Sequence, residues 1–115
     1  MVRSVCSIAV LVLFATSGYA HHGWSEYDTA KALNLSGVVK AAGYEHPHGH
    51  VRLETPGKTW TVILAPPSRM ENRGLAAADL KPGARVTVAG YPNRGKPDEM
   101  RAELITVNAK TIELR

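Results

Sequence analysis

Cysteine is almost absent from this 115-residue chain, and the single cysteine, Cys6, lies within the first twenty residues. The rest of the chain therefore cannot form a disulfide, a thiolate metal site or a cysteine nucleophile. Metal binding or catalysis by this remainder must depend on histidines, carboxylates, hydroxyls or a cofactor.

Aromatic residues are also scarce, at 6% of the chain. Five of them follow residue 20, namely Trp24, Tyr27, Tyr44, Trp60 and Tyr91. They are too few and too scattered for a platform on which nucleic-acid bases stack, and the formal net charge of +4 is modest. We therefore expect no nucleic-acid partner, attribute the basic balance to solubility, and expect Trp60 to belong to the core.

Long hydrophobic runs are missing as well. The longest, Val5 to Ala15, has about half of the roughly twenty residues that a membrane span requires. Arg3 precedes this run and Gly18-Tyr19-Ala20 follows it, a pattern typical of a secretory signal. We expect cleavage after Ala20, a periplasmic or secreted protein with net charge +3, and no membrane span after cleavage.

Alternation of apolar and polar residues predicts strands in the remaining chain. Three strands are expected first, with Pro56-Gly57 as a hairpin turn between the second and the third, and two or three more are expected after residue 83. The expected strand ranges are 33–41, 51–55, 59–64, 84–91, 100–107 and 110–114.

A short helix is expected between the third and fourth strands. Ser68 and Glu71 have the spacing of a capping box, and Gly74 is placed to end the helix. Met70 and Leu75 would have to pack on the core, because so short a helix is marginal by propensity alone.

This order of elements predicts an all-β, OB-like barrel of five to six strands with one short helix between strands 3 and 4. Gly37 and Gly90 fall inside strands, where a small barrel bends at its corners. A three-stranded sheet with a helix, or a sandwich, fits the order less well. The expected organisation is a signal peptide at 1–20, a histidine-containing segment at 21–32 and the barrel domain at 33–115.

The five histidines all lie at or before residue 50, in two groups: His21 and His22, and His46, His48 and His50. Cleavage after Ala20 would place a free amine on His21. The amine with the His21 ring, or the amine, the next amide and the His22 ring, would form a nitrogen-rich chelate that suits Cu(II). Solvation of both side chains beside a cleavage site is the alternative.

The second group lies in the predicted loop between strands 1 and 2, where OB folds receive ligands. Spacing of two residues on extended chain places His46, His48 and His50 on one side, so two imidazoles could converge on one ion. An exposed polar turn is the alternative. The segment between His21 and Leu33 is long enough for the terminus to fold back onto this loop. Glu26 and Asp28 could complete such a site, although solvated surface carboxylates are the more common case.

A further set of residues forms a pattern along the whole expected mature chain: Ala20-His21-His22-Gly23-Trp24, Asp28, Gly37, Pro47-His48, Trp60, Arg73-Gly74, Leu80-Lys81-Pro82-Gly83, Val86-Thr87-Val88 and Gly90. In this pattern the chain resembles the small exported bacterial proteins grouped as domain of unknown function 6152. It departs from the family at His46, where Asn is usual, and at Ala84, where an acidic residue is usual. The resemblance implies export and a small β fold and leaves the activity open.

These observations lead to one main hypothesis and two alternatives. The main hypothesis is a periplasmic carrier or buffer for a transition metal, with copper as the expected ion, that uses His21, His22 and His48, with His46 and His50 as weaker candidates. The first alternative is a metal-free OB-fold adaptor that binds a small molecule or a protein partner through the same loop. The second is a copper oxidase or monooxygenase, because an N-terminal histidine chelate also serves oxygen chemistry.

Overall fold

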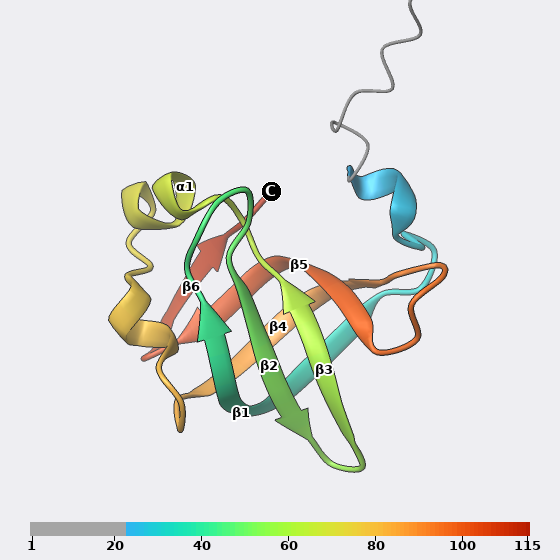
Figure 1. The fold of residues 1–115 in the computed structure, drawn as a ribbon, viewed down its shortest axis with the longest axis horizontal. Helices are drawn as coiled ribbons and strands as arrows, with labels where there is room; N and C mark the ends of the chain where they lie inside the picture. Colours follow the sequence, from blue (N-terminus) through green and yellow to red (C-terminus); the bar gives the residue numbers. More distant parts are fainter. Residues whose placement is uncertain (1–22) are drawn as a thin grey trace, which may run out of the picture.

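The computed structural model describes residues 23–115 (Figure 1). Along this part of the chain the elements are η2 (Trp24–Glu26), β1 (Leu33–Gly43), β2 (His50–Thr55), β3 (Lys58–Ile63), α1 (Pro67–Asn72), η3 (Ala77–Leu80), β4 (Arg85–Pro92), β5 (Glu99–Val107) and β6 (Lys110–Glu113). The predicted order of three strands, a helix and further strands is confirmed. The two 3-10 helices, η2 and η3, were not expected.

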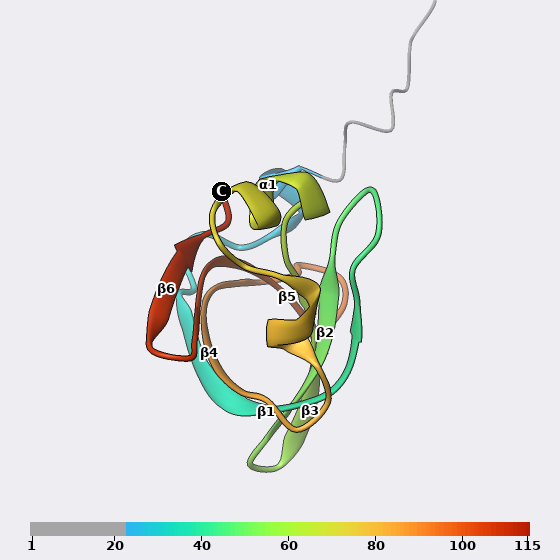
Figure 2. The ribbon, with the colours of Figure 1, turned by 90° about the vertical axis from the view of Figure 1, so that its left-hand side faces the viewer.

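The strands form one sheet in the order β3-β2-β1-β4-β5-β6, and a parallel pairing of β3 with β5 closes it. Figure 2 shows β1 to β5 as a ring, with β6 beside it and η3 across one end of the barrel. The fold is therefore the expected OB-like barrel of five strands with one extra strand.

The core fills the barrel because alternate residues of each strand point inward. On β2, Val51 and Leu53 are fully buried and Arg52 between them is exposed. The hairpin turn at Pro56-Gly57 pairs Leu53 with Trp60, which packs against the core as expected and is half-buried. The other large side chains that are almost completely buried are Val39, Val62, Leu64, Met70, Leu75, Leu80, Val86, Val88, Met100 and Ile105.

Helix α1 begins two residues earlier than the capping box predicts. Pro66 is the N-cap and Pro67 the first helical residue, a position that suits proline because its missing N–H would have no partner there. The predicted capping role of Ser68 is therefore wrong. The predicted end is confirmed, because Gly74 has a φ of +92° and the N–H of Leu75 donates to the carbonyl of Met70 at 2.8 Å.

Gly37 and Gly90 lie where two backbones approach closely at the barrel corners. A Cβ on Gly37 would lie 2.1 Å from the carbonyl oxygen of Glu54 on β2, and one on Gly90 would lie 1.9 Å from that of Arg101 on β5. The β4–β5 register shifts between Ala89 and Gly90, so this contact coincides with a bulge. Both glycines have the expected role.

Substitution Gly90→Ala should destabilise the barrel, because β5 would have to move away from the added methyl group. We expect the free energy of unfolding to fall by about 1–3 kcal/mol or more. Gly95→Ala is the matched control, because its Cβ would meet nothing closer than 3.8 Å. Urea unfolding of both variants checks the prediction, and equal midpoints would contradict it.

Candidate functional site

The five histidines that the sequence singles out divide into two sets in the structure. His21 and His22, like the expected signal segment, lie outside the described residues. His46 and His48 lie in the loop between β1 and β2, and His50 is the first residue of β2. The three histidines therefore lie in different local structures: two in the β1–β2 loop and one at the start of β2.

His46 and His50 have surroundings unlike those of His48. His46 is exposed at a bend and its peptide bond to Pro47 is cis. The ring of His50 covers Gly43 on β1, since a Cβ on that glycine would lie 2.2 Å from the His50 Cε1 atom. Only His50 of the three belongs to a strand, so the extended spacing behind the loop hypothesis does not reach back to His46.

The loop that carries His48 is fixed at both ends. Near its start, the hydroxyl of Tyr44 donates to the carbonyl of Leu75 at 2.6 Å. Near its end, the N–H of Gly49 donates to Ala65 at 2.9 Å, and the carbonyl of Gly49 accepts from the N–H of Leu64 at 2.8 Å. His48 is thus held in a defined place, half-buried and two residues before β2 begins.

His48 lies against an arginine of β5. The Nη2 atom of Arg101 is 3.4 Å from Nε2 of His48. Because guanidinium groups only donate, this contact uses the lone pair of Nε2 and places the ring proton of a neutral His48 on Nδ1. A metal ion at Nε2 would have to displace Arg101.

Arg101 is itself largely buried, with 7% of its surface exposed. Burial lowers its pKa, and the positive charges of Arg69 and Arg115 lower it further, whereas Tyr27 acts in the opposite direction. Since the ordinary pKa of arginine exceeds 12, the side chain remains charged near neutral pH. The rim therefore carries a fixed positive charge beside His48.

Trp24 of η2 packs on this charge. The guanidinium carbons of Arg101 and Arg115 lie 4.4 and 4.6 Å from the centre of its ring, within the range of cation–π attraction. Tyr27 and Tyr91 meet the same ring edge-on, at 6.4 and 6.2 Å between ring centres. Trp24 is thereby fixed next to the residue that contacts His48.

The segment after Trp24 is also held to the barrel. Tyr27 is 4% exposed, and its hydroxyl donates to Glu99 of β5 at 2.9 Å. The N–H of Asp28 donates to Pro92 at 2.9 Å, and the N–H of Arg94 donates to the carbonyl of Glu26 at 2.9 Å. These contacts determine where the chain enters the described structure.

The carboxylate of Asp28 takes part in local contacts. Asp28 accepts the N–H of Ala30 at 3.1 Å, and Lys31 lies 3.9 Å from it. Within residues 23–115, no three His, Cys, Asp or Glu side chains are grouped so that they could hold a metal ion.

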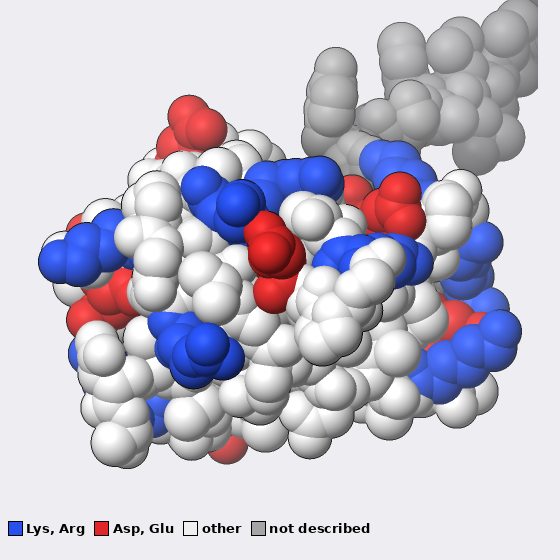
Figure 3. Space-filling model, turned by 90° about the horizontal axis from the view of Figure 1, so that it is seen from below, with Lys and Arg blue, Asp and Glu red and all other residues white. Residues whose placement is uncertain are grey.

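Sequence reasoning missed Arg101 and the arginines around it. The signal in the sequence was a charged residue between two apolar ones, Met100 and Ala102, within an expected strand. In the structure both of these neighbours are fully buried. Elsewhere the surface is mixed: Figure 3 shows Lys and Arg interspersed with Asp and Glu on the face seen from below.

Comparison with solved structures finds a similar fold as part of a longer chain. Over 77% of its length it is similar to a chain in the crystal structure of TiaS in complex with a tRNA and ATP, with a TM-score of 0.53 and 20% identity. It spans 20% of that chain, and the similarity concerns the fold.

The family model of DUF6152, a family of unknown function, matches residues 9–101, and the chain belongs to this family. Among proteins with curated descriptions, none matches. In the described part of the chain, no helix is long and apolar enough to cross a membrane.

Tyr27→Phe should make the protein less sensitive to alkali. Burial raises the pKa of Tyr27, and its hydrogen bond to Glu99 raises it further. The neutral phenol therefore contributes stability that is complete below the unfolded pKa, near 10, and is lost as pH rises toward the folded pKa. By pH 11 this loss amounts to about 1 kcal/mol, and the variant should lack it.

Urea unfolding of both proteins at pH 8 and pH 11 measures this difference. The pKa values of Tyr44 and Tyr91 are also raised, but both tyrosines remain in the variant, so their contribution cancels. An equal alkaline loss of stability in the two proteins would show that Tyr27 is not responsible.

Proposed function

We propose that this protein binds a transition-metal ion, copper by preference, as an exported carrier or buffer. The proposed site combines the amine and the histidines of a mature terminus at His21 with the imidazole of His48. Signal cleavage after Ala20 and location in the periplasm are part of this proposal.

One observation carries it: a single arginine side chain connects Trp24, near the start of the described residues, with His48. Trp24 stacks on Arg101, and Arg101 contacts His48. Two residues of extended chain span at most about 7 Å and three about 11 Å, a reach on which the proposed approach of His22 and His21 to His48 depends. The idea that the terminus reaches the loop thus has support from the position of Trp24.

The chemistry of the donors favours copper. Amine, amide and imidazole nitrogens in a tetragonal arrangement suit Cu(II), which also heads the affinity order of the first-row divalent ions. No cysteine follows residue 20, so thiolate ligands that would favour Cu(I) or zinc are absent from this segment. A chelate that includes a deprotonated amide also lowers the charge of the bound ion, which reduces its repulsion by Arg101.

His48 must release Arg101 before its Nε2 atom can bind a metal ion. We therefore assign most of the affinity to the terminal chelate and a smaller part to His48. His46 is exposed and His50 covers Gly43, so neither is expected to contribute much.

The contact of His48 with Arg101 favours one alternative specifically. If His48 only positions Arg101, the same rim would serve a metal-free adaptor that binds a small molecule or a protein. A metal carrier should need both the terminus and His48 for its affinity for copper, whereas a metal-free adaptor should not.

Protein that begins at His21 should bind one Cu(II) tightly, whereas protein with a long N-terminal tag should bind much more weakly, because the tag removes the α-amine. Calorimetry on the two proteins measures the difference. Protein with one added Met is an unsuitable control, because Met-His-His creates a new terminal chelate with histidine in third position. Equal affinities would exclude the amine as a ligand.

His48→Ala in protein with its native terminus should lower the affinity for Cu(II) by roughly tenfold, which corresponds to about 1.4 kcal/mol. His46→Ala is the matched control and should leave the affinity nearly unchanged, because this side chain is exposed at the bend. Circular dichroism would verify that both variants fold. Unchanged affinity in His48→Ala would leave only the terminal chelate and favour the adaptor.

A further inference from the structure

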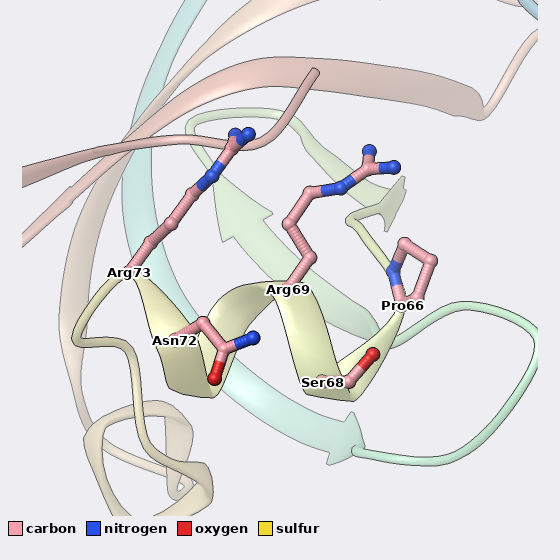
Figure 4. Close-up of a pocket in the computed structure, with 5 residues that line it drawn as sticks. All are labelled: Pro66, Ser68, Arg69, Asn72 and Arg73. Atoms are coloured by element: carbon pink, nitrogen blue, oxygen red, sulfur yellow. The ribbon is translucent and has the colours of Figure 1, made fainter.

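A polar pocket lies along α1, and none of its lining residues is a histidine. We call it the arginine pocket; it is lined by Pro66, Ser68, Arg69, Asn72 and Arg73 and has a volume of about 340 Å³. Figure 4 shows the two arginine side chains extending in the same direction from the helix, toward the C-terminal segment. Four of the five lining residues carry groups that can donate a hydrogen bond.

The spacing along the helix explains this arrangement. Residues four apart lie on the same side of a helix, so Arg69 neighbours Arg73 and Ser68 neighbours Asn72. Glu71 is two positions from each arginine and therefore faces another side. The result is a basic row beside an uncharged polar row.

Both arginines are held in place by backbone groups. Nη1 of Arg69 donates to the carbonyl of Leu114 at 3.1 Å. Nη1 of Arg73 donates to the main-chain oxygens of Glu113 and of Arg115, the last residue of the sequence, at 2.7 and 3.1 Å. A guanidinium has five N–H groups, so these bonds orient each side chain and leave further donors available.

The charge of these two arginines is not compensated by acidic side chains within the described residues. Neither Arg69 nor Arg73 forms an ion pair with a carboxylate there, whereas Arg115 pairs with Glu103 at 2.8 Å. The Ser68 hydroxyl and the Asn72 amide make no hydrogen bond within residues 23–115 either. Because Pro66 rather than Ser68 caps α1, the Ser68 hydroxyl is not used by the helix.

We propose that the arginine pocket binds an oxyanion of the phosphate type. Two oriented guanidinium groups match the geometry of phosphate oxygens, and the hydroxyl and the amide add uncharged donors. A cation would meet two positive charges here, so this site and the proposed metal site take ligands of opposite sign. The proposal does not depend on the amine, His21, His22 or His48.

Titration of the metal-free protein with inorganic phosphate, at ionic strength held constant with potassium chloride, tests the proposal by nitrogen–proton NMR. We expect saturable shifts of the amides of residues 68–73 and competition by sulfate. Protein with a long N-terminal tag should bind phosphate equally well, which distinguishes failure of this proposal from failure of the metal hypothesis. Linear shifts without saturation would overturn it.

Charge variants make the test specific. Arg69→Gln and Arg73→Gln should each weaken phosphate binding at least tenfold, and Arg85→Gln, which removes an equal charge from an exposed residue at the start of β4, should change it less than twofold. Ser68→Asp keeps both arginine contacts with the backbone and places a carboxylate in the pocket, so it should abolish binding. Equal affinity of Ser68→Asp and Arg85→Gln would contradict the proposal.

A phosphomonoester such as phenyl phosphate distinguishes a free anion from a phosphate group on a larger molecule. Binding tighter than that of inorganic phosphate would identify the latter, and binding of equal strength or weaker would identify the free anion. Both results presuppose an oxyanion site, whereas failure of both probes to saturate the amides of residues 68–73 would exclude it.

Discussion

The contact between the Arg101 guanidinium and the Trp24 ring connects the parts of this structure that bear on function. Arg101 reaches the rim from β5, the strand whose parallel pairing with β3 closes the barrel. Its charge holds Trp24, and with it the point at which the N-terminal segment meets the barrel, while its Nη2 atom contacts His48. Because cation–π attraction strengthens when water is excluded, burial of Arg101 makes this anchor stronger than an exposed pair would be.

Two kinds of positive charge on this molecule have different consequences. Arg101 is largely buried, and its guanidinium contacts the Trp24 ring and the His48 imidazole. A metal ion at Nε2 of His48 would therefore compete with Arg101 for this nitrogen. Arg69 and Arg73 are exposed, and each donates hydrogen bonds to main-chain oxygens. We therefore propose a cation at the neutral nitrogen donors of the terminus and an anion at the arginine pocket. The two proposals therefore concern ligands of opposite sign.

Much of the fold could be predicted from local patterns. Alternation such as that of Val51 and Leu53 indicates strands, and a glycine such as Gly90 inside a strand indicates a corner where backbones meet. The cap of α1 could not be read from Ser68 and Glu71 alone, because Pro67 with its fixed φ suits the first helical position and begins the helix earlier. The neighbourhood of His48 could not be read either, because it depends on the pairing of β3 with β5 and on packing between residues far apart in the sequence. The loop histidines could be singled out by residue type, whereas the contacts of Arg101 with His48 and Trp24 could be seen only in the tertiary structure.

The central claim is that the mature terminus lies against the loop of His48, and paramagnetic broadening by bound Cu(II) measures this directly. In nitrogen–proton spectra of protein that begins at His21, a substoichiometric amount of Cu(II) should broaden the amide signals of Gly49 and Arg101, while that of Gly57 in the β2–β3 turn stays sharp. Broadening restricted to residues before Ser25, with Gly49 and Arg101 unaffected, would contradict the account.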